Sequence, residues 1–229
     1  MLKKILGMAT LAATLLLTGC ATVKPMAFST EAAKPPAADK AVFLMTATFK
    51  NVYRTSFQPK LLVANVEKPV VQGSEDRLNF RIDTEGSFEN TSPDKGNTYL
   101  LRMELPPGEY TLVGMTCLNK SFPILAQYFV PVHAKIVASA PGTYYLGHVD
   151  AVLRERQGNE FRAGAPIPLI DQAIGGGSGG TFDVAIFDRW TEDQPLFHSR
   201  FPAMKDLTVA SAPLPPFDRE YAQKWWEDH

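Results

Sequence analysis

Hydrophobic and polar side chains alternate in short runs along most of this chain, and that alternation constrains the fold more than any other feature. From residue 78 on, for example, Leu78, Phe80 and Ile82 alternate with Asn79 and Arg81. A period of two puts successive side chains on opposite faces of a strand, as in half-buried antiparallel sheets. The predicted strands lie at 41–49, 60–66, 78–83, 99–104, 109–116, 128–139, 143–154 and 182–187.

Turn residues separate these runs, which favours an all-β fold. Gly, Pro, Asn, Asp and Ser cluster at 72–74, 94–97, 106–108, 141–142 and 157–159. No helical pattern of 12 or more residues appears before residue 190. With 45% hydrophobic and 21% charged residues, the 229-residue chain has a globular composition and enough length for one core. We therefore predict an antiparallel β-sandwich of about eight strands; the alternative is an open barrel with a ligand cavity.

The first twenty residues have the features of an export signal. Lys3 and Lys4 precede the apolar run 5–17, which is too short to span a bilayer core of about 30 Å. The sequence LTGC at 17–20 follows, and it resembles the lipobox of bacterial lipoproteins. That resemblance implies cleavage before Cys20 and attachment of lipid to its sulfur and its new amino group. Several acyl chains anchor a protein stably in a membrane.

The residue after the cysteine indicates in which membrane such a lipoprotein resides. In Gram-negative lipoproteins an aspartate there usually marks retention in the inner membrane, whereas Ala21 follows Cys20 here. The resemblance thus implies an outer-membrane protein that faces the periplasm. Loss of Lys3 and Lys4 changes the net charge from −1 to −3, so the lipid, rather than a basic patch, is expected to hold the protein. Nor does this charge favour nucleic acid as a partner.

Residues 20–40 carry no strand or helix period. They are rich in Ala, Pro, Lys and Thr, and Pro35-Pro36 disfavours a helix. We predict a flexible tether with a root-mean-square span of about 25 Å. The predicted organisation is a signal peptide at 1–19, a tether at 20–40, a β-sandwich domain at 41–190 and a C-terminal extension at 191–229 that ends in a short aromatic helix.

Two segments carry a second family resemblance. LPPGEYTL at 105–112 lies between two predicted strands, and APGTYYLG at 140–147 opens another. A Pro-Gly-x-Tyr turn followed by a strand resembles repeated features of transthyretin-like, immunoglobulin-like sandwich domains in uncharacterised bacterial envelope lipoproteins. Proline presets φ at such a turn, glycine supplies positive φ, and the tyrosine packs over the hairpin. The resemblance implies a fold and transfers no catalytic residue.

One motif has the form of a hydrolase signature. Gly176-Gly177-Ser178-Gly179-Gly180 matches G-x-S-x-G. A nucleophile elbow, however, needs a buried strand before the serine and a helix after it, and here a predicted strand follows. We interpret the run as a mobile glycine loop and predict no catalytic residue.

Candidate metal ligands are few. The four histidines are His133, His148, His198 and His229. His148 and Asp150 lie two apart on one strand and face the same side, but spacing suggests no third ligand for zinc, so we predict no metal and no cofactor. The carboxylates Glu155, Glu160, Asp171, Asp183 and Asp188 are interpreted as solvated faces. If Cys20 carries lipid, Cys117 has no disulfide partner, and we predict a small buried side chain.

The C-terminal tail differs in character from the strand region. Residues 211–216 read SAPLPP, which suits an extended chain, and a helical pattern follows. Phe217, Tyr221 and Trp225 fall at i, i+4 and i+8, with Trp226 beside them. This aromatic face either packs on the sandwich or docks a partner or the membrane. The four acids and two bases of the tail favour a protein partner over an anionic membrane.

Three functions remain open at this stage. The first is a lipid-anchored, non-enzymatic accessory or binding module of an outer-membrane or periplasmic assembly. The second is a carrier of a small apolar or sugar ligand, held by Tyr144, Tyr145 and the loop 164–180. The third is an enzyme of unknown type. A large apolar pocket favours the carrier, and a flat apolar patch near the tail favours the partner module.

Overall fold

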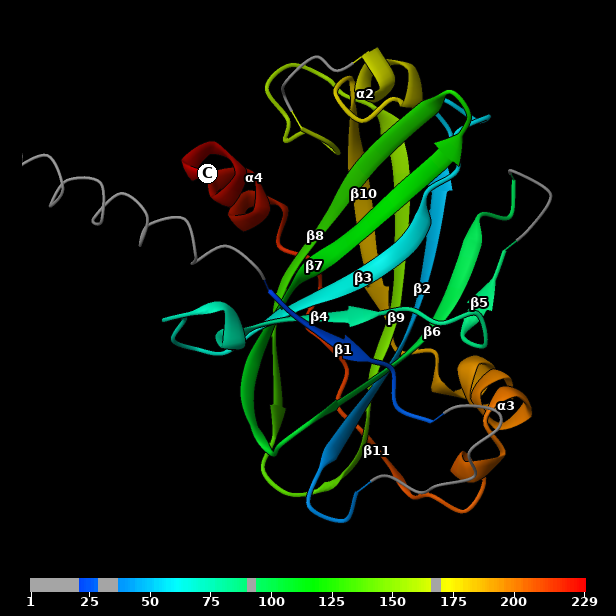
Figure 1. The fold of residues 1–229 in the computed structure, drawn as a ribbon, viewed down its shortest axis with the longest axis vertical. Coiled ribbons are helices and arrows are strands. Elements are labelled where there is room, and N and C mark those ends of the chain that lie inside the picture. Colours follow the sequence, from blue (N-terminus) through cyan, green and yellow to red (C-terminus); the bar gives the residue numbers. More distant parts are fainter. Residues whose placement is uncertain (1–20, 29–36, 90–93, 166–169) are drawn as a thin grey trace, which may run out of the picture.

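The computed structural model describes residues 21–28, 37–89, 94–165 and 170–229, which form a mostly β structure of two sheets (Figure 1). Strands account for 48% of the structure and helices for 17%. The strands are β1 (Thr22–Pro25), β2 (Ala41–Asn51), β3 (Lys60–Glu67), β4 (Arg77–Arg81), β5 (Ser87–Phe88), β6 (Asn97–Leu105), β7 (Gly108–Ser121), β8 (Ile124–Ala138), β9 (Gly142–Glu155), β10 (Gly180–Phe187) and β11 (Val209–Ser211). The helices are α2 (Ile170–Gly175), α3 (Trp190–Arg200) and α4 (Arg219–Asp228), with 3-10 turns at Ser74–Asp76 and Pro202–Met204.

The strands form two sheets of mixed direction. Sheet 1 has the order β1-β4-β3-β7-β8, and sheet 2 has the order β10-β9-β2-β6-β5, with β11 added to β9. All eight predicted strands are present as β2, β3, β4, β6, β7, β8, β9 and β10, which confirms the alternation analysis. The expectation of purely antiparallel pairing was wrong, because β1 pairs with β4, β2 with β9 and β11 with β9 in parallel.

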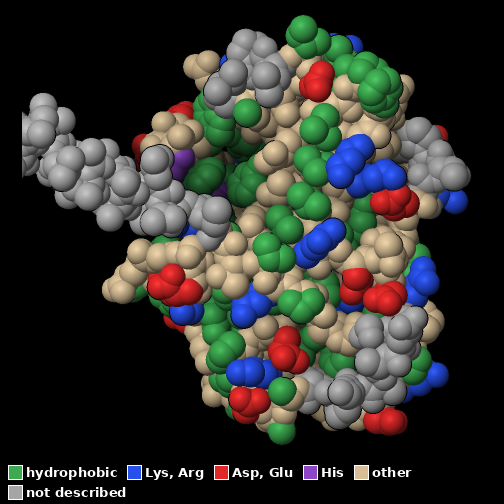
Figure 2. Space-filling view, viewed as in Figure 1, with side chains coloured by type: hydrophobic (Ala, Val, Ile, Leu, Met, Phe, Trp, Pro, Cys, Tyr) green, Lys and Arg blue, Asp and Glu red, His purple; other side chains and the backbone are tan. Residues whose placement is uncertain are grey.

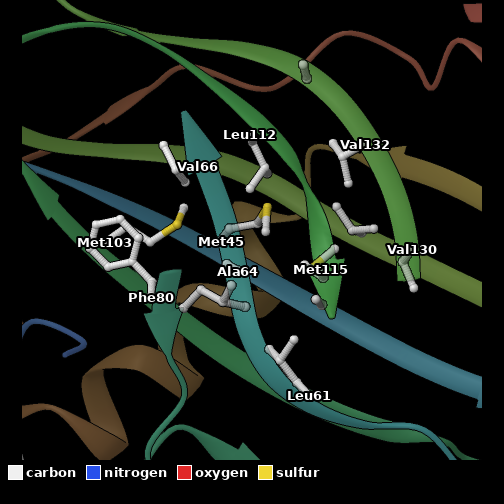
Figure 3. Packing of buried hydrophobic residues seen from close by; sticks show 14 of the residues in the cluster. Met45, Leu61, Ala64, Val66, Phe80, Met103, Leu112, Met115, Val130 and Val132 are labelled. Carbon is white, nitrogen blue, oxygen red and sulfur yellow. The ribbon is translucent and has the colours of Figure 1, made fainter. Parts of the chain in front are cut away.

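One hydrophobic core lies between the two sheets (Figure 3). Met45 and Met103 from sheet 2 and Ala64, Leu112 and Val130 from sheet 1 all contribute side chains to this core. These positions belong to the apolar set of each alternating strand, so the period of two in the sequence places them inside. The predicted buried thiol is confirmed, because Cys117 is fully buried in this cluster and burial raises its pKa well above the usual value.

The outer face of sheet 2 is covered over half of its length. Val42, Leu44, Leu100 and Tyr145 point away from the main core and form a second buried cluster with Phe197 of α3. The outward positions of β2 then become polar toward the end of the strand. Helix α3 therefore covers the apolar half and leaves the polar half uncovered, as its position below β5 and β6 in Figure 1 indicates.

The segment expected to be a tether begins with a strand. Residues 22–25 form β1 in sheet 1, and Met26 and Phe28 are buried. A fully buried arginine, Arg102, holds this segment, since its guanidinium donates to the backbone oxygens of Ala27 and Phe28. The flexible-tether prediction is therefore wrong for residues 22–28, because local composition does not show pairing with a strand 56 residues away, as between Thr22 and Leu78. Residues 29–36 lie outside the described residues.

The C-terminal extension runs over both sheets. Strand β11 joins β9, where Ala212 N donates to Tyr145 O at 2.9 Å and Leu214 N donates to Leu146 O at 2.8 Å. The chain then reaches sheet 1, where α4 lies beside β8 (Figure 1). No helix within the described ranges is both long and apolar enough to cross a membrane.

Candidate functional site

Helix α4 begins where the sequence predicts. Asp218 is its N-cap, and the Asp218 carboxylate accepts a hydrogen bond from Tyr221 N at 2.8 Å. An N-cap carboxylate satisfies a free amide of the first turn and complements the helix dipole. The expected short aromatic helix is thus confirmed at Arg219–Asp228.

The helix docks on the protein itself. Ala222 is buried in the main core cluster, and the Gln223 amide accepts from Phe161 N at 2.6 Å and donates to Asn159 O at 2.8 Å. Phe217 and Trp226 pack half-buried against the same cluster. The most buried position is therefore Ala222, one residue from the predicted aromatic face, because a small side chain allows close approach. Tyr221, with 53% of its surface exposed, contributes little to this contact.

Two arginines and two acids fasten the start of α4. Arg219 lies 2.7 Å from Glu160 and 3.2 Å from Asp183, and Arg154 lies 2.7 Å from each of the same acids. The hydrogen bond from Arg154 is the main cause that lowers the pKa of Glu160 to about 2. Both acids were interpreted from sequence as solvated: Asp183 is exposed as expected, whereas Glu160 is mostly buried, and both are ion-paired where β9, β10 and α4 meet.

Aromatic rings crowd the contact between α4 and β8. Trp225 stacks on Phe129 with ring centroids 5.9 Å apart, and on His229 at 4.6 Å. His133 lies 4.7 Å from Trp225 and meets the edge of Tyr221 at 5.4 Å. Burial, with a smaller contribution from the charge of His229, lowers the pKa of His133 to about 4, so the ring is neutral at pH 7. Trp225 is therefore held by rings on several sides.

A groove of about 480 Å³ opens beside these rings. Its floor is β8, one wall is the end of α4, and the other walls are the segment after β9 and helix α2. Figure 2 shows hydrophobic side chains and a histidine gathered in a hollow next to α4. The groove is lined by Gln127, Tyr128, Phe129, Arg162, Gly164, Ala165, Gln172, Trp225, Trp226 and His229.

Backbone hydrogen bonds fix the walls of the groove. Phe129 N donates to Ala163 O at 2.7 Å, and Ala163 N donates to Gly180 O at 2.8 Å, so residues 161–164 link β8 to β10. The Arg162 guanidinium donates to Ser178 O at 2.7 Å. The groove thus combines four aromatic side chains with a few amide and cationic groups, which is the usual make-up of a ligand site.

The glycine run supports this wall and has no hydrolase geometry. A helix, α2, precedes it and β10 follows it, which is the reverse of a nucleophile elbow. A β-carbon on Gly175 would lie 2.4 Å from the Ala126 side chain, and one on Gly177 would lie 2.4 Å from the Gln172 amide. The interpretation as a mobile loop does not fit this packing, because a β-carbon on Gly177 or Gly180 would lie within 3.0 Å of a neighbouring atom and Gly176 has φ +88. Local sequence shows only that glycine is present, not what approaches it.

The structure separates several residues that the sequence grouped. Tyr145 is buried beneath α3 and Tyr144 packs on Phe43, so neither joins the described part of the loop, 164–165 and 170–180, at a common ligand mouth. His148 and Asp150 do face one cleft, on the outer face of sheet 2. Within the described ranges, no group of three or more His, Cys, Asp or Glu side chains is arranged to hold a metal.

The remaining predicted residues lie apart. Asp171 accepts from Leu125 N at 3.0 Å, Asp188 accepts from Trp190 N at 3.2 Å, and Glu155 is exposed. His198 lies on α3. Cys20, the predicted lipid attachment site, lies outside the described residues. Sequence reasoning missed Arg162 and Gln127 as groove residues, because no local pattern marks a wall built by three distant segments, whereas Gln172 lies in the loop 164–180 that was expected to hold a ligand.

Comparison of the chain with protein-family models, with curated proteins and with solved structures finds no match. The functional conclusion below therefore rests on the motif at residues 17–20 and on the groove.

Proposed function

We propose that this protein is a lipid-anchored, non-enzymatic binding module of the bacterial cell envelope, held at the outer membrane and facing the periplasm. The lipobox-like sequence at 17–20 and Ala21 after the cysteine support the anchor and its destination. The two-sheet architecture and its Pro-Gly-x-Tyr turns are compatible with a transthyretin-like sandwich. The membrane partner would be reached through lipid on Cys20, and a protein of the envelope would be the second partner.

The aromatic groove is the observation that carries the binding role. It exposes parts of Phe129, Trp225 and Trp226 beside Arg162 and Gln127. Tryptophan and arginine dominate the binding energy of protein interfaces, and such residues act from well-packed positions. Because α4 is docked by Ala222 and its ion pairs, these rings are already ordered before a ligand arrives. Little entropy is lost on binding to such a preorganised surface.

The start of β1 sets how the module would sit on the membrane. Thr22, the first residue of β1, follows Cys20 by two positions in the sequence. Two residues of extended chain span at most about 7 Å. Lipid on Cys20 would therefore hold the β1 edge of sheet 1 at the membrane surface, instead of letting the body stand off on a long tether.

A charge placed in the groove tests the binding role. We expect a photo-crosslinking residue at position 165, which lines the groove and is exposed, to give one discrete protein adduct in intact cells. Adding Gln127→Arg should reduce that adduct at least tenfold, which corresponds to a loss of about 1.4 kcal/mol at the centre of the contact. Val137→Arg is the matched control, since Val137 is also exposed on β8 but does not line the groove. An adduct that Gln127→Arg leaves intact would contradict this role.

The groove volume also favours a second candidate function, a carrier of a small ligand. About 480 Å³ is within the usual range of small-molecule sites, roughly 300–1,000 Å³. Native mass spectrometry of protein purified from membranes separates the two functions. A bound small molecule that Gln127→Arg displaces indicates the carrier, whereas a crosslinked protein with no small molecule indicates the partner module. Absence of both rules out the groove as a site.

A further inference from the structure

A second cleft, unrelated to the groove, lies on the uncovered half of the outer face of sheet 2. It has a volume of about 420 Å³ and its floor consists of strands β2, β6 and β9. The residues that line it are Thr48, Lys50, Asp94, Lys95, Thr98, His148, Asp150, Val152 and Arg189. Nearly all of these side chains are polar, in contrast to the aromatic groove on sheet 1.

Strand register builds the floor of this cleft. Thr48 pairs with Thr98 on one side and with Asp150 on the other, and the two threonine hydroxyls are 2.8 Å apart. A β-bulge lies just before His148, where Gly147 has φ +105 and the register shifts. The extra residue keeps both Tyr145 and His148 on the outer face, although they are three positions apart.

A buried chain of hydrogen bonds fixes the histidine at the edge of the cleft. Asp193 accepts from the hydroxyls of Thr46 and Tyr145, each at 2.5 Å, and Thr46 Oγ1 lies 2.7 Å from His148 Nδ1. Thr46 has one hydroxyl proton, which goes to Asp193, so the proton between Thr46 and His148 must belong to Nδ1. Burial lowers the pKa of His148, and Arg189 lowers it further, so the ring is neutral at pH 7. Its Nε2 is therefore an acceptor.

Three cations, Lys50, Lys95 and Arg189, line the same cleft and outnumber its two acids, Asp94 and Asp150. Within the described ranges, no carboxylate forms an ion pair with any of these three cations, and this includes Asp94 and Asp150 in the cleft itself. Arg189 is also the N-cap residue of α3, so the positive end of that helix dipole adds to the field and is partly offset by Glu192 and Asp193 in the first turn. The cleft thus combines a cationic rim with acceptors for hydroxyl groups at His148 Nε2 and Asp150.

We propose that this cleft binds a small sugar-like anion, one that carries several hydroxyl groups and a single phosphate or carboxylate. Arg189, Lys50 and Lys95 would hold the anionic group by charge-assisted hydrogen bonds. Asp150 and His148 would accept hydrogen bonds from hydroxyls of the same ligand, and Thr48 and Thr98 would complete the polar floor. A simple anion leaves these acceptors unused, and a neutral sugar leaves the cations unused, so the full set fits a molecule that has both features.

Calorimetric titration of the purified full-length protein tests this assignment with four probes. We expect glucose 6-phosphate and glucuronate to bind, and glucose and inorganic phosphate to bind at least tenfold more weakly. Whichever of glucose 6-phosphate and glucuronate binds more tightly identifies the anionic group of the ligand as a phosphate or a carboxylate. Arg189→Gln and Lys50→Gln should each weaken binding of that probe at least tenfold. Arg81→Gln is the matched control, because Arg81 is an exposed arginine on β4 of sheet 1.

Replacing one acceptor separates sugar recognition from simple anion binding. Asp150→Asn should reduce the preference for glucose 6-phosphate or glucuronate over inorganic phosphate, because a carboxylate that accepts from hydroxyls is lost. No heat from any probe up to about 10 mM would overturn the proposal, as would equal affinity for inorganic phosphate or binding that Arg189→Gln leaves unchanged. These outcomes are independent of the groove, since none of these variants lies on α4 or β8.

Discussion

Asp83→Ala is expected to lower the free energy of unfolding by about 3 kcal/mol, because it removes the counter-charge of a fully buried arginine. Arg102 has no exposed side-chain surface, and its guanidinium is ion-paired with Asp83 and lies 3.9 Å over the Phe201 ring. Burial lowers the pKa of Arg102, while the charge of Asp83 raises it. Without Asp83, the charge stays buried with no carboxylate hydrogen-bonded to it, beside backbone carbonyls and the Phe201 ring. Since 29% of the Asp83 side chain is exposed, the expected loss is at the lower end for buried pairs.

Thermal unfolding measures this effect as a drop in Tm of about 6–12 °C. Asp83→Asn separates the charge from the local turn, because an amide oxygen can still accept from Gly86 N as the carboxylate does at 2.8 Å. Glu109→Ala is the control for an exposed ion pair, Lys135–Glu109, and should change stability by no more than about 1 kcal/mol. Equal melting temperatures for Asp83→Ala and Glu109→Ala would show that the buried pair does not fix the segment at residues 26–28.

Removal of residues 217–229 is the change with the second largest expected effect. It deletes α4, exposing the core around Phe161 that Ala222 and Trp226 cover, and it breaks the ion pairs of Arg219. These contacts amount to about 2–3 kcal/mol. We expect Tm to fall by about 5–10 °C while the far-ultraviolet circular dichroism spectrum remains dominated by strands.

A matched pair of point variants separates the loss of α4 packing from the shortening of the chain. Ala222→Asp places an unpaired charge in the buried contact of α4, and it should reproduce most of the loss seen on truncation. Lys224→Asp makes a comparable change at an exposed position of the same helix and should leave Tm within about 1 °C. If the truncated protein has the same Tm as the full-length protein, the tail serves only to contact a partner.

The strand pattern made most of the fold predictable. Each of the eight strands was recognisable because one face of each strand is buried and the other is not, and that difference is visible in the residues themselves. The short strands β1, β5 and β11 were missed. Thr22–Pro25 and Val209–Ser211 are too short to show a period, and they become strands only because the edges of β4 and β9 are available for pairing.

The sites were less predictable than the fold, for a physical reason. Trp225 was identified from its spacing and Trp226 as its aromatic neighbour, and the placement of His148 and Asp150 on one face followed from the period of two. Asp193 and Arg162 were not identified, because their roles depend on contacts with strands far away in the sequence. One signal was present: along β2 the outward residues change from Val42 and Leu44 to threonines and lysine, which marks where the cover of the sheet ends.

The tail shows how spacing alone misjudges a helix face. An i, i+4, i+8 set of aromatics predicted the buried side, yet Tyr221 is more than half exposed and Ala222 is buried. The spacing argument considered only the large aromatic rings and overlooked Ala222, whose small side chain permits close contact with Phe161. The start of the helix was nevertheless predictable, because Asp218 caps the first turn by a local interaction that sequence reveals.

Metabolic labelling with palmitate tests the central claim, that a lipid on Cys20 anchors this module, more directly than any other measurement. The wild-type protein should incorporate the label and sediment with membranes, and Cys117→Ser should behave in the same way because Cys117 is buried in the core. Cys20→Ser should carry no label and leave the membrane fraction. A Cys20→Ser protein that still incorporates palmitate, or a wild-type protein that incorporates none, would contradict the account.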